Sequence, residues 1–77
     1  MWKESDNKLV REFRFKDFPE AFTFMTRVAF LCEKANHHPA WFNIHNYVRI
    51  ELSTHEAGDI VTEKDRQLAM KIDDILG

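Results

Sequence analysis

The sequence predicts an α+β fold, a two-layer sandwich in which two helices cover one face of a four-stranded antiparallel sheet. Apolar and polar residues alternate in short segments near the N-terminus and again after residue 40, as in half-buried strands. Between and after these segments, apolar residues recur every three or four positions, as on one face of a helix. The resulting order, β-β-α-β-β-α, is typical of a two-layer sandwich. The 77 residues are expected to form a single domain, 1–77.

The first strand pair is predicted from the segment 9–16, in which apolar and polar residues alternate. Its apolar face carries Leu9, Phe13 and Phe15, with Arg11 as the exception. The polar run 5–7 is a turn signal, so residues 2–4 are the expected hairpin partner.

The long central helix is predicted to begin at Asp17, a residue type that caps helices, with Pro19 in its first turn. Helical spacing connects Phe18, Ala21, Phe22, Met25, Val28, Ala29 and Cys32, and Phe24 and Leu31 widen this stripe. The width fits a helix that covers a sheet, and it also fits a helix that contacts a second subunit. The helix is expected to end near Asn36, because Pro39 disfavours helical backbone at His38.

The second strand pair is predicted at 41–45 and 47–53, as a hairpin that turns near Asn46. One face of the later strand carries Val48, Ile50 and Leu52. We expect Phe42 and Ile44 of the earlier strand to extend this apolar side.

The last helix is predicted to follow a loop at 56–61 and to begin with a capping box at 62–65, in which Asp65 takes the place of Glu. The residues that this helix is expected to bury are Leu68, Ala69, Ile72, Ile75 and Leu76. The phenylalanines expected in the core are Phe13, Phe15, Phe22, Phe24 and Phe42.

Composition argues against several classes of function. The formal net charge is −2 and no long block of like charge occurs, which argues against binding to nucleic acid. No apolar run approaches the roughly 20 residues of a membrane span, and residues 1–9 do not resemble a signal peptide. The single cysteine, Cys32, fits a reducing compartment, so the expected location is cytoplasmic. Its place on the apolar stripe predicts a buried, inert thiol.

Histidines are the residues best suited to chemistry near neutral pH. His37 and His38 follow the predicted long helix, and His55 follows the second hairpin strand. Histidines on short connections can transfer protons, but they can also cap helix carbonyls or lie in solvent. A metal site made of these histidines and Cys32 is disfavoured, because adjacent histidines rarely ligate one ion and no HExxH or CxxC spacing occurs.

Two neighbours of the histidines allow more than one role. Trp41 could stack against a planar ligand or contact a second subunit. Asp65 could act only as the third residue of its helix, or it could also support the histidines.

Two runs of residues resemble the pterin-4a-carbinolamine dehydratase family. They are Glu-Lys-Ala-Asn-His-His-Pro-Ala-Trp-Phe-Asn at 33–43 and Leu-Ser-Thr-His-Glu-Ala-Gly at 52–58. The likeness continues through Phe13-x-Phe15-x-Asp17-Phe18 and Asp65-x-x-Leu68-Ala69, so it covers nearly the whole chain. The spaced signature Glu-x3-His-His-Pro…Thr-His is highly specific for the family.

The resemblance implies an enzyme that needs neither a metal nor another cofactor. It would dehydrate a 4a-hydroxytetrahydropterin to the quinonoid dihydropterin, after an aromatic amino acid hydroxylase has acted. The family pattern implies catalytic residues at His37, His38 and His55, substrate contacts at Pro39, Trp41, Thr54 and Glu56, and supporting acids at Asp65 and Glu33. A relative in this family also serves as a dimerization cofactor of a homeodomain transcription factor, so a non-catalytic binding module is the alternative.

Three features depart from the family pattern. The sequence opens on the first strand where many members carry a further helix, and the usual Gly-Gly-Leu loop is replaced by Gly-Asp-Ile-Val at 58–61, one residue longer. His45 stands where a tyrosine is expected. None of these changes removes a catalytic histidine. Because a core this small is marginal alone, a homodimer or homotetramer is expected.

Overall fold

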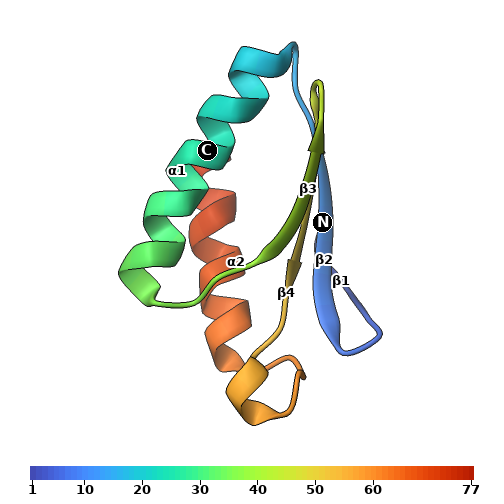
Figure 1. Cartoon of the computed structure of the whole chain (residues 1–77), viewed down its shortest axis with the longest axis vertical. Helices are drawn as coiled ribbons and strands as arrows, with labels where there is room; N and C mark the ends of the chain where they lie inside the picture. Colours follow the sequence, from blue (N-terminus) through green and yellow to red (C-terminus); the bar gives the residue numbers. More distant parts are fainter.

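The computed structural model describes all 77 residues and has the predicted α+β architecture (Figure 1). The elements are β1 (Lys3–Ser5), β2 (Lys8–Arg14), α1 (Phe18–Ala35), β3 (Ala40–Ile44), β4 (Tyr47–Leu52), a short 3₁₀ turn (His55–Ala57) and α2 (Glu63–Leu76). The four strands form one antiparallel sheet in the order β1-β2-β4-β3. Figure 1 shows both helices on the same face of this sheet. Neither helix combines the length and apolar character that a membrane span requires.

The core lies between the sheet and the two helices. Its twelve buried residues are Leu9 and Phe13 of β2, Val48, Ile50 and Leu52 of β4, Ala21, Phe24, Val28 and Cys32 of α1, and Leu68, Ala69 and Ile72 of α2. Each fully buried Val, Leu or Ile stabilises the fold by about 1.5–3 kcal/mol relative to exposure. The two central strands and the inner faces of the helices therefore hold the domain together.

Arg11 is the exception on the apolar face of β2, and the structure supplies its partner. Its Nη1 lies 2.5 Å from Oδ1 of Asp73, which also accepts the indole N–H of Trp2 at 2.8 Å. The guanidinium lies over the ring of Phe13, 4.6 Å from its centroid. The N-terminal hairpin is thereby attached to the end of α2.

Both helices begin as predicted. The carboxylate of Asp17 accepts the backbone N–H of Glu20 at 2.9 Å. The capping box of α2 is formed, with the backbone N–H of Thr62 donating to Oδ2 of Asp65 at 2.8 Å. The first helix ends at Asn36, whose φ of 50° is left-handed and turns the chain away from the helix axis.

The prediction for β3 was wrong about which side chains face the core. A two-residue turn pairs Ile44 with Tyr47, and this register places Phe42 opposite Arg49. Residues directly opposite each other in antiparallel strands share a face. Phe42 and Ile44 therefore lie on the open face, 48% and 62% exposed, whereas Trp41 pairs with Ile50 on the helix side.

The prediction that Phe22 lies in the core was also wrong. Phe22 is 53% exposed and points outward from α1 together with Phe18 and Phe30. The helix can bury only one face, and Ala21, Phe24, Val28 and Cys32 occupy it. Leu76, expected to be buried, is exposed in the last turn of α2. Phe13 and Phe24 are buried as predicted, and Phe15 packs against the core while partly exposed.

Candidate active site

His37 is a buried histidine positioned by the end of α1. The left-handed turn at Asn36 lets the backbone N–H of His37 donate to the carbonyl of Cys32 at 3.0 Å. The residue is 7% exposed, and its ring Nε2 lies 2.6 Å from Oδ1 of Asp65. Because an ionised carboxylate can only accept, Nε2 carries the hydrogen and Nδ1 holds the lone pair.

Asp65 lies in the first turn of α2 and is fully buried. Its Oδ1 accepts from His37, and its Oδ2 accepts from the backbone N–H of Thr62 and the hydroxyl of Thr54, both at 2.8 Å. Burial alone would raise the pKa of Asp65, but the hydrogen bonds from His37, Thr62 and Thr54 outweigh it and hold this pKa below its usual range. The carboxylate is thus a buried anion with a complete set of donors.

Thr54 connects the exit of β4 to this carboxylate. It is buried, and its only hydroxyl hydrogen goes to Asp65, so the hydroxyl of Thr62, 2.5 Å away, must donate to Thr54. The backbone N–H of Thr54 donates to the carbonyl of Ile60 at 2.8 Å. The end of α1 and the end of β4 therefore meet at Asp65, which hydrogen-bonds both His37 and Thr54, the residue before His55.

His55 and His38 are exposed, and each is paired with a carboxylate of its own. Nδ1 of His55 lies 2.9 Å from Oδ1 of Asp59, and Nε2 of His38 lies 3.1 Å from Oε1 of Glu33. The hydrogen bond to Asp59 and then its charge raise the pKa of His55; desolvation opposes them, and the charge of Glu56 adds a weaker increase.

One ring nitrogen of each of these three histidines remains available. Nδ1 of His37 has no hydrogen-bond partner in the protein. The only side-chain nitrogen or oxygen that is both fully buried and without a partner is Nε of Arg11, so Nδ1 of His37 is not fully buried. Nδ1 of His37 therefore reaches the surface. Nδ1 of His38 and Nε2 of His55 likewise have no partner in the protein. The arrangement offers one shielded imidazole and two solvated ones for proton transfer.

A hollow of about 290 Å³ lies beside His37, between the end of α1 and the first half of α2. Its lining consists of Ala35, His37, Glu63, Lys64, Gln67, Leu68 and Lys71. His38, His55 and Trp41 do not line it. Trp41 borders a separate hollow of about 90 Å³ with Ala40, Phe42, Arg49 and Glu51.

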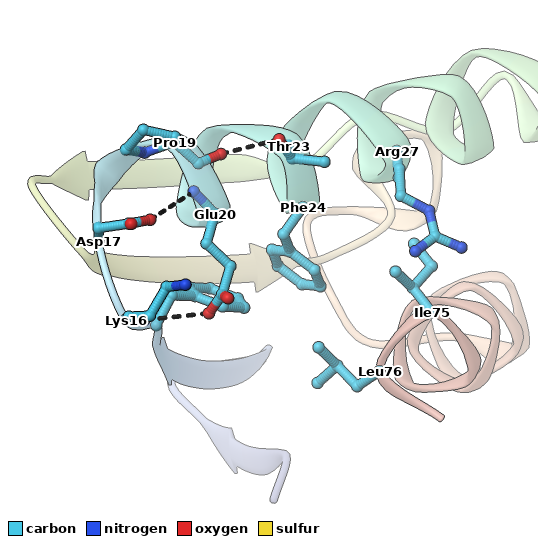
Figure 2. Close-up of a pocket in the computed structure, with 10 residues that line it drawn as sticks. Lys16, Asp17, Pro19, Glu20, Thr23, Phe24, Arg27, Ile75 and Leu76 are labelled. Atoms are coloured by element: carbon cyan, nitrogen blue, oxygen red, sulfur yellow. Dashed lines mark hydrogen bonds between the residues drawn. The ribbon is translucent and has the colours of Figure 1, made fainter.

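The largest hollow of the molecule, about 550 Å³, lies at the opposite end of the helix pair (Figure 2). The aromatic ring of Phe24, the guanidinium of Arg27 and the side chain of Ile75 border it. Both carboxylates in its lining accept hydrogen bonds from backbone N–H groups. The carboxylate of Asp17 accepts from the N–H of Glu20, and the carboxylate of Glu20 accepts from the N–H of Lys16. Since this hollow contains no histidine, its size does not make it the better candidate for proton transfer.

The predicted site residues fall into two groups. His37, Thr54 and Asp65 form one buried hydrogen-bonded network. The exposed or half-buried residues are His38, His55, Glu33, Pro39, Trp41 and Glu56. Sequence reasoning missed the contribution of Asp59 and the role of Thr62 beyond capping; the replacement of the family loop at 58–61 was the signal that could have drawn attention to Asp59.

No three His, Cys, Asp or Glu side chains converge in a way that could hold a metal ion. Cys32 is buried, and burial raises the pKa of its thiol to about 11. A thiol with so high a pKa is protonated near neutral pH and is a poor nucleophile.

Residues 1–75 match the family model described as pterin 4 alpha carbinolamine dehydratase. A protein of Prochlorococcus marinus (strain MIT 9515) is 51% identical over 74 residues, which are 96% of this chain and 76% of that protein. A protein of Rhizobium meliloti (strain 1021) is 56% identical over 70 residues, 91% of this chain and 66% of that protein. Both carry the provisional name pterin-4-alpha-carbinolamine dehydratase.

Two solved structures share the fold. The transcriptional coactivator/pterin dehydratase from Brucella melitensis has a TM-score of 0.92 at 44% identity, covering 99% of this chain and 82% of that one. A pterin dehydratase-like protein, identified as a RuBisCO assembly factor in the alpha-carboxysome, has a TM-score of 0.83 at 26% identity, covering 99% and 89%.

Proposed function

Because the chain belongs to the pterin-4-alpha-carbinolamine dehydratase family, we propose that it removes water from a 4a-hydroxytetrahydropterin and releases the quinonoid dihydropterin. The observation that carries this proposal is the buried couple of His37 and Asp65, joined through Thr54 to the segment that bears His55.

The reaction requires two proton transfers. One proton must reach the hydroxyl at C4a so that it leaves as water, and one must be taken from the neighbouring ring nitrogen. The electron pair of that N–H bond then forms the C=N double bond while the C4a–O bond breaks. Histidines held in place by carboxylates suit both transfers near neutral pH, and such general acid–base catalysis is worth about 10²–10⁴-fold in rate. No metal ion, redox group or covalent intermediate is needed.

The substrate contacts are proposed from the family pattern. Pro39 and Trp41 follow the histidine pair, and Glu56 follows His55, so all three adjoin catalytic positions. Thr54 is less suited to touch substrate, because its hydroxyl is buried and hydrogen-bonded to Asp65. A positioning role fits Thr54 better.

A homo-oligomer is proposed from the outward face of α1. Phe18, Phe22 and Phe30 are all exposed there, which is costly for an isolated small domain. A second copy packed on this face would remove the three rings from water. A functional link to an aromatic amino acid hydroxylase, which would supply the hydroxylated pterin, is part of the same proposal.

The second candidate is a binding module without catalysis. It is favoured by the relative identified as a RuBisCO assembly factor and by the same exposed aromatic face. Such a module would need the α1 surface and not the histidines, so the two functions predict different sensitive residues.

The deciding experiment is a dehydration assay with a 4a-hydroxytetrahydropterin generated in situ. The wild type should accelerate its decay over buffer, and His37→Ala and His55→Ala should each lower turnover by at least an order of magnitude. His45→Ala serves as the control, because His45 lies in the β3–β4 turn and its side chain hydrogen-bonds only to Asn46. Decay no faster than in buffer, or equal losses in all three variants, would leave the binding module ahead.

A further inference from the structure

The loop after β4 holds one more carboxylate against a histidine. Backbone N–H groups of Ala57 and Asp59 donate to the carbonyl of Thr54 at 3.2 and 3.1 Å, and that of Gly58 donates to the carbonyl of His55 at 3.0 Å. Gly58 and Asp59 both have left-handed backbone, with φ of 94° and 60°. This closed turn directs the side chain of Asp59 back onto the ring of His55.

We propose that Asp59 is a positioning residue that orients His55 and makes it the proton donor to the departing hydroxyl. The inference rests on the proposed dehydration and adds to it the direction of proton flow. It also gives a role to a residue of the loop that departs from the family pattern.

The geometry fixes which atom of His55 faces outward. Nδ1 lies 2.9 Å from Oδ1 of Asp59, and an ionised carboxylate can only accept a hydrogen bond. Nδ1 must therefore carry a hydrogen, and Nε2 is the ring atom left for substrate. When the ring is charged, Nε2–H is a donor aimed away from the loop.

The charges around His55 favour that protonated form. Asp59 supplies the hydrogen bond and the nearest negative charge, and these raise the pKa of His55. Glu56 adds a weaker effect of the same sign, and Nζ of Lys64 in α2 lies 3.9 Å from Oε1 of Glu56. Asp59 and Glu56 are thus the charged groups of the loop that act on the ring, and Lys64 of α2 is paired with Glu56.

Access to water separates His55 from His37. The side chain of His55 is 88% exposed, so it regains a proton from solvent after each turnover, whereas His37 is 7% exposed. In the proposed step, His55 Nε2 gives its proton to the C4a hydroxyl, which leaves as water. His37 Nδ1 takes the proton from the neighbouring ring nitrogen, and Asp65 stabilises the imidazolium that forms. Both histidines then return to their starting charge by exchange with solvent.

The first test needs no substrate. The ring resonances of His55, assigned with a His55→Gln variant, are followed against pH by NMR in the wild type and in Asp59→Asn. Asn tolerates the left-handed backbone of position 59, so the loop should keep its shape. The pKa of His55 should fall in Asp59→Asn, while those of the other histidines stay unchanged.

The matched control is Asp6→Asn. Asp6 also has left-handed backbone, with φ of 51°, but it lies in the β1–β2 turn and makes no hydrogen bond or ion pair with a histidine. The pKa of His55 should be the same in Asp6→Asn as in the wild type. An equal pKa in wild type and Asp59→Asn would overturn the proposal, whatever the activity.

The second test is the pH profile of kcat/KM. A proton donor must be protonated, so activity is lost as pH rises through its pKa. In Asp59→Asn the alkaline limb should therefore move to lower pH by the same interval as the NMR pKa of His55, and the acid limb should stay in place. A moved acid limb, or an unmoved alkaline limb beside a lowered His55 pKa, would show that His55 is not the donor. A wild type without activity would overturn the dehydration itself, a result distinct from the substrate-free titration.

Discussion

Replacement of Asp65 by Asn is the most informative single change, because it alters the charge of the buried network with almost no change in volume. In the variant, the amide oxygen can still accept from Thr54 and from the backbone N–H of Thr62. The amide NH₂ group then faces Nε2 of His37, where the carboxylate oxygen had been. His37 must therefore accept at Nε2 and carry its hydrogen on Nδ1, the tautomer opposite to that of the native protein.

The loss of stability in Asp65→Asn can be worked out from the three hydrogen bonds that the Asp65 carboxylate accepts, which become bonds to a neutral amide. A hydrogen bond to a charged group contributes about 1.5–3 kcal/mol and a neutral one about 0.5–1.5 kcal/mol, so three weakened bonds represent roughly 3 kcal/mol. Relief from burying a charge offsets part of this, which leaves an expected loss of about 1–3 kcal/mol. A chain of this size has a total stability of about 4–11 kcal/mol. The variant should therefore fold, with a Tm lowered by about 4–8 °C for each kcal/mol lost.

The pH dependence of this loss has a definite sign. The folded-state pKa of Asp65 lies below its unfolded value, so its contribution is fully present above the unfolded pKa of about 4. It is lost as pH falls through the folded pKa. Denaturant unfolding should therefore show the full difference between wild type and Asp65→Asn at pH 6–8, and a shrinking one below about pH 4.

Turnover should fall by at least an order of magnitude in Asp65→Asn, because Nδ1 of His37 no longer offers a lone pair to the substrate. Asp73→Asn is the matched control: Asp73 lies on the same helix, and its carboxylate accepts from Trp2 and Arg11 and from no histidine. It should lose stability and keep its turnover per folded molecule. Wild-type turnover in folded Asp65→Asn, or equal losses in the two variants, would refute the assigned tautomer.

Three further predictions concern binding, metal dependence and assembly. His38→Ala should raise KM at least as much as it lowers kcat, since His38 is exposed and paired only with Glu33; steady-state kinetics separate the two effects, and a pure kcat loss would contradict this division. Dialysis against a strong chelator should leave turnover unchanged, because the proposed chemistry is proton transfer alone; a loss that one added ion restores would overturn the prediction. Sedimentation at micromolar concentration should show a dimer or tetramer, and Phe30→Ser should shift it toward the 9.2 kDa monomer without loss of fold, since Phe30 is outside the core; a monomeric wild type would be the contrary result.

The sequence predicted the kind and order of every strand and α-helix, because periodicity in short strands and long helices is a strong local signal; the short 3₁₀ turn at His55–Ala57 was predicted as loop. The prediction was wrong where apolar residues occur on both faces of an element, because the pattern then does not show which face is buried. In the run 41–44, three of the four residues are apolar, so alternation does not distinguish the inner face from the outer one. The register set by the two-residue turn decides, and it places Trp41 inward and Phe42 outward. Phe22 failed for the related reason that the apolar stripe of α1 is wider than the face that the sheet can cover.

The site was predictable only in part. The motif identified His37, His55 and Asp65 without their geometry, because the motif reflects residue type and spacing alone. The directions in which the side chains of Thr54 and Asp59 point depend on irregular backbone, including the left-handed φ of 60° at Asp59. Sequence periodicity does not predict the side-chain direction in such a segment. The inward hydroxyl of Thr54, hydrogen-bonded to Asp65, is the reason why we propose a supporting role for Thr54 where the sequence predicted a substrate contact.

Asp65 joins folding and chemistry in one side chain. A capping box usually has Glu or Gln at its third helical position, whose longer side chain reaches back to the cap residue. Here the position is fully buried, and the shorter carboxylate accepts from Thr62 with one oxygen while it presents the other to His37. An additional methylene would overfill this space and displace one of the two oxygens. Aspartate is thus the acid whose length lets it bind both the backbone N–H of Thr62 and Nε2 of His37. The capping box that stabilises the start of α2 therefore also holds the imidazole ring that we propose as the base.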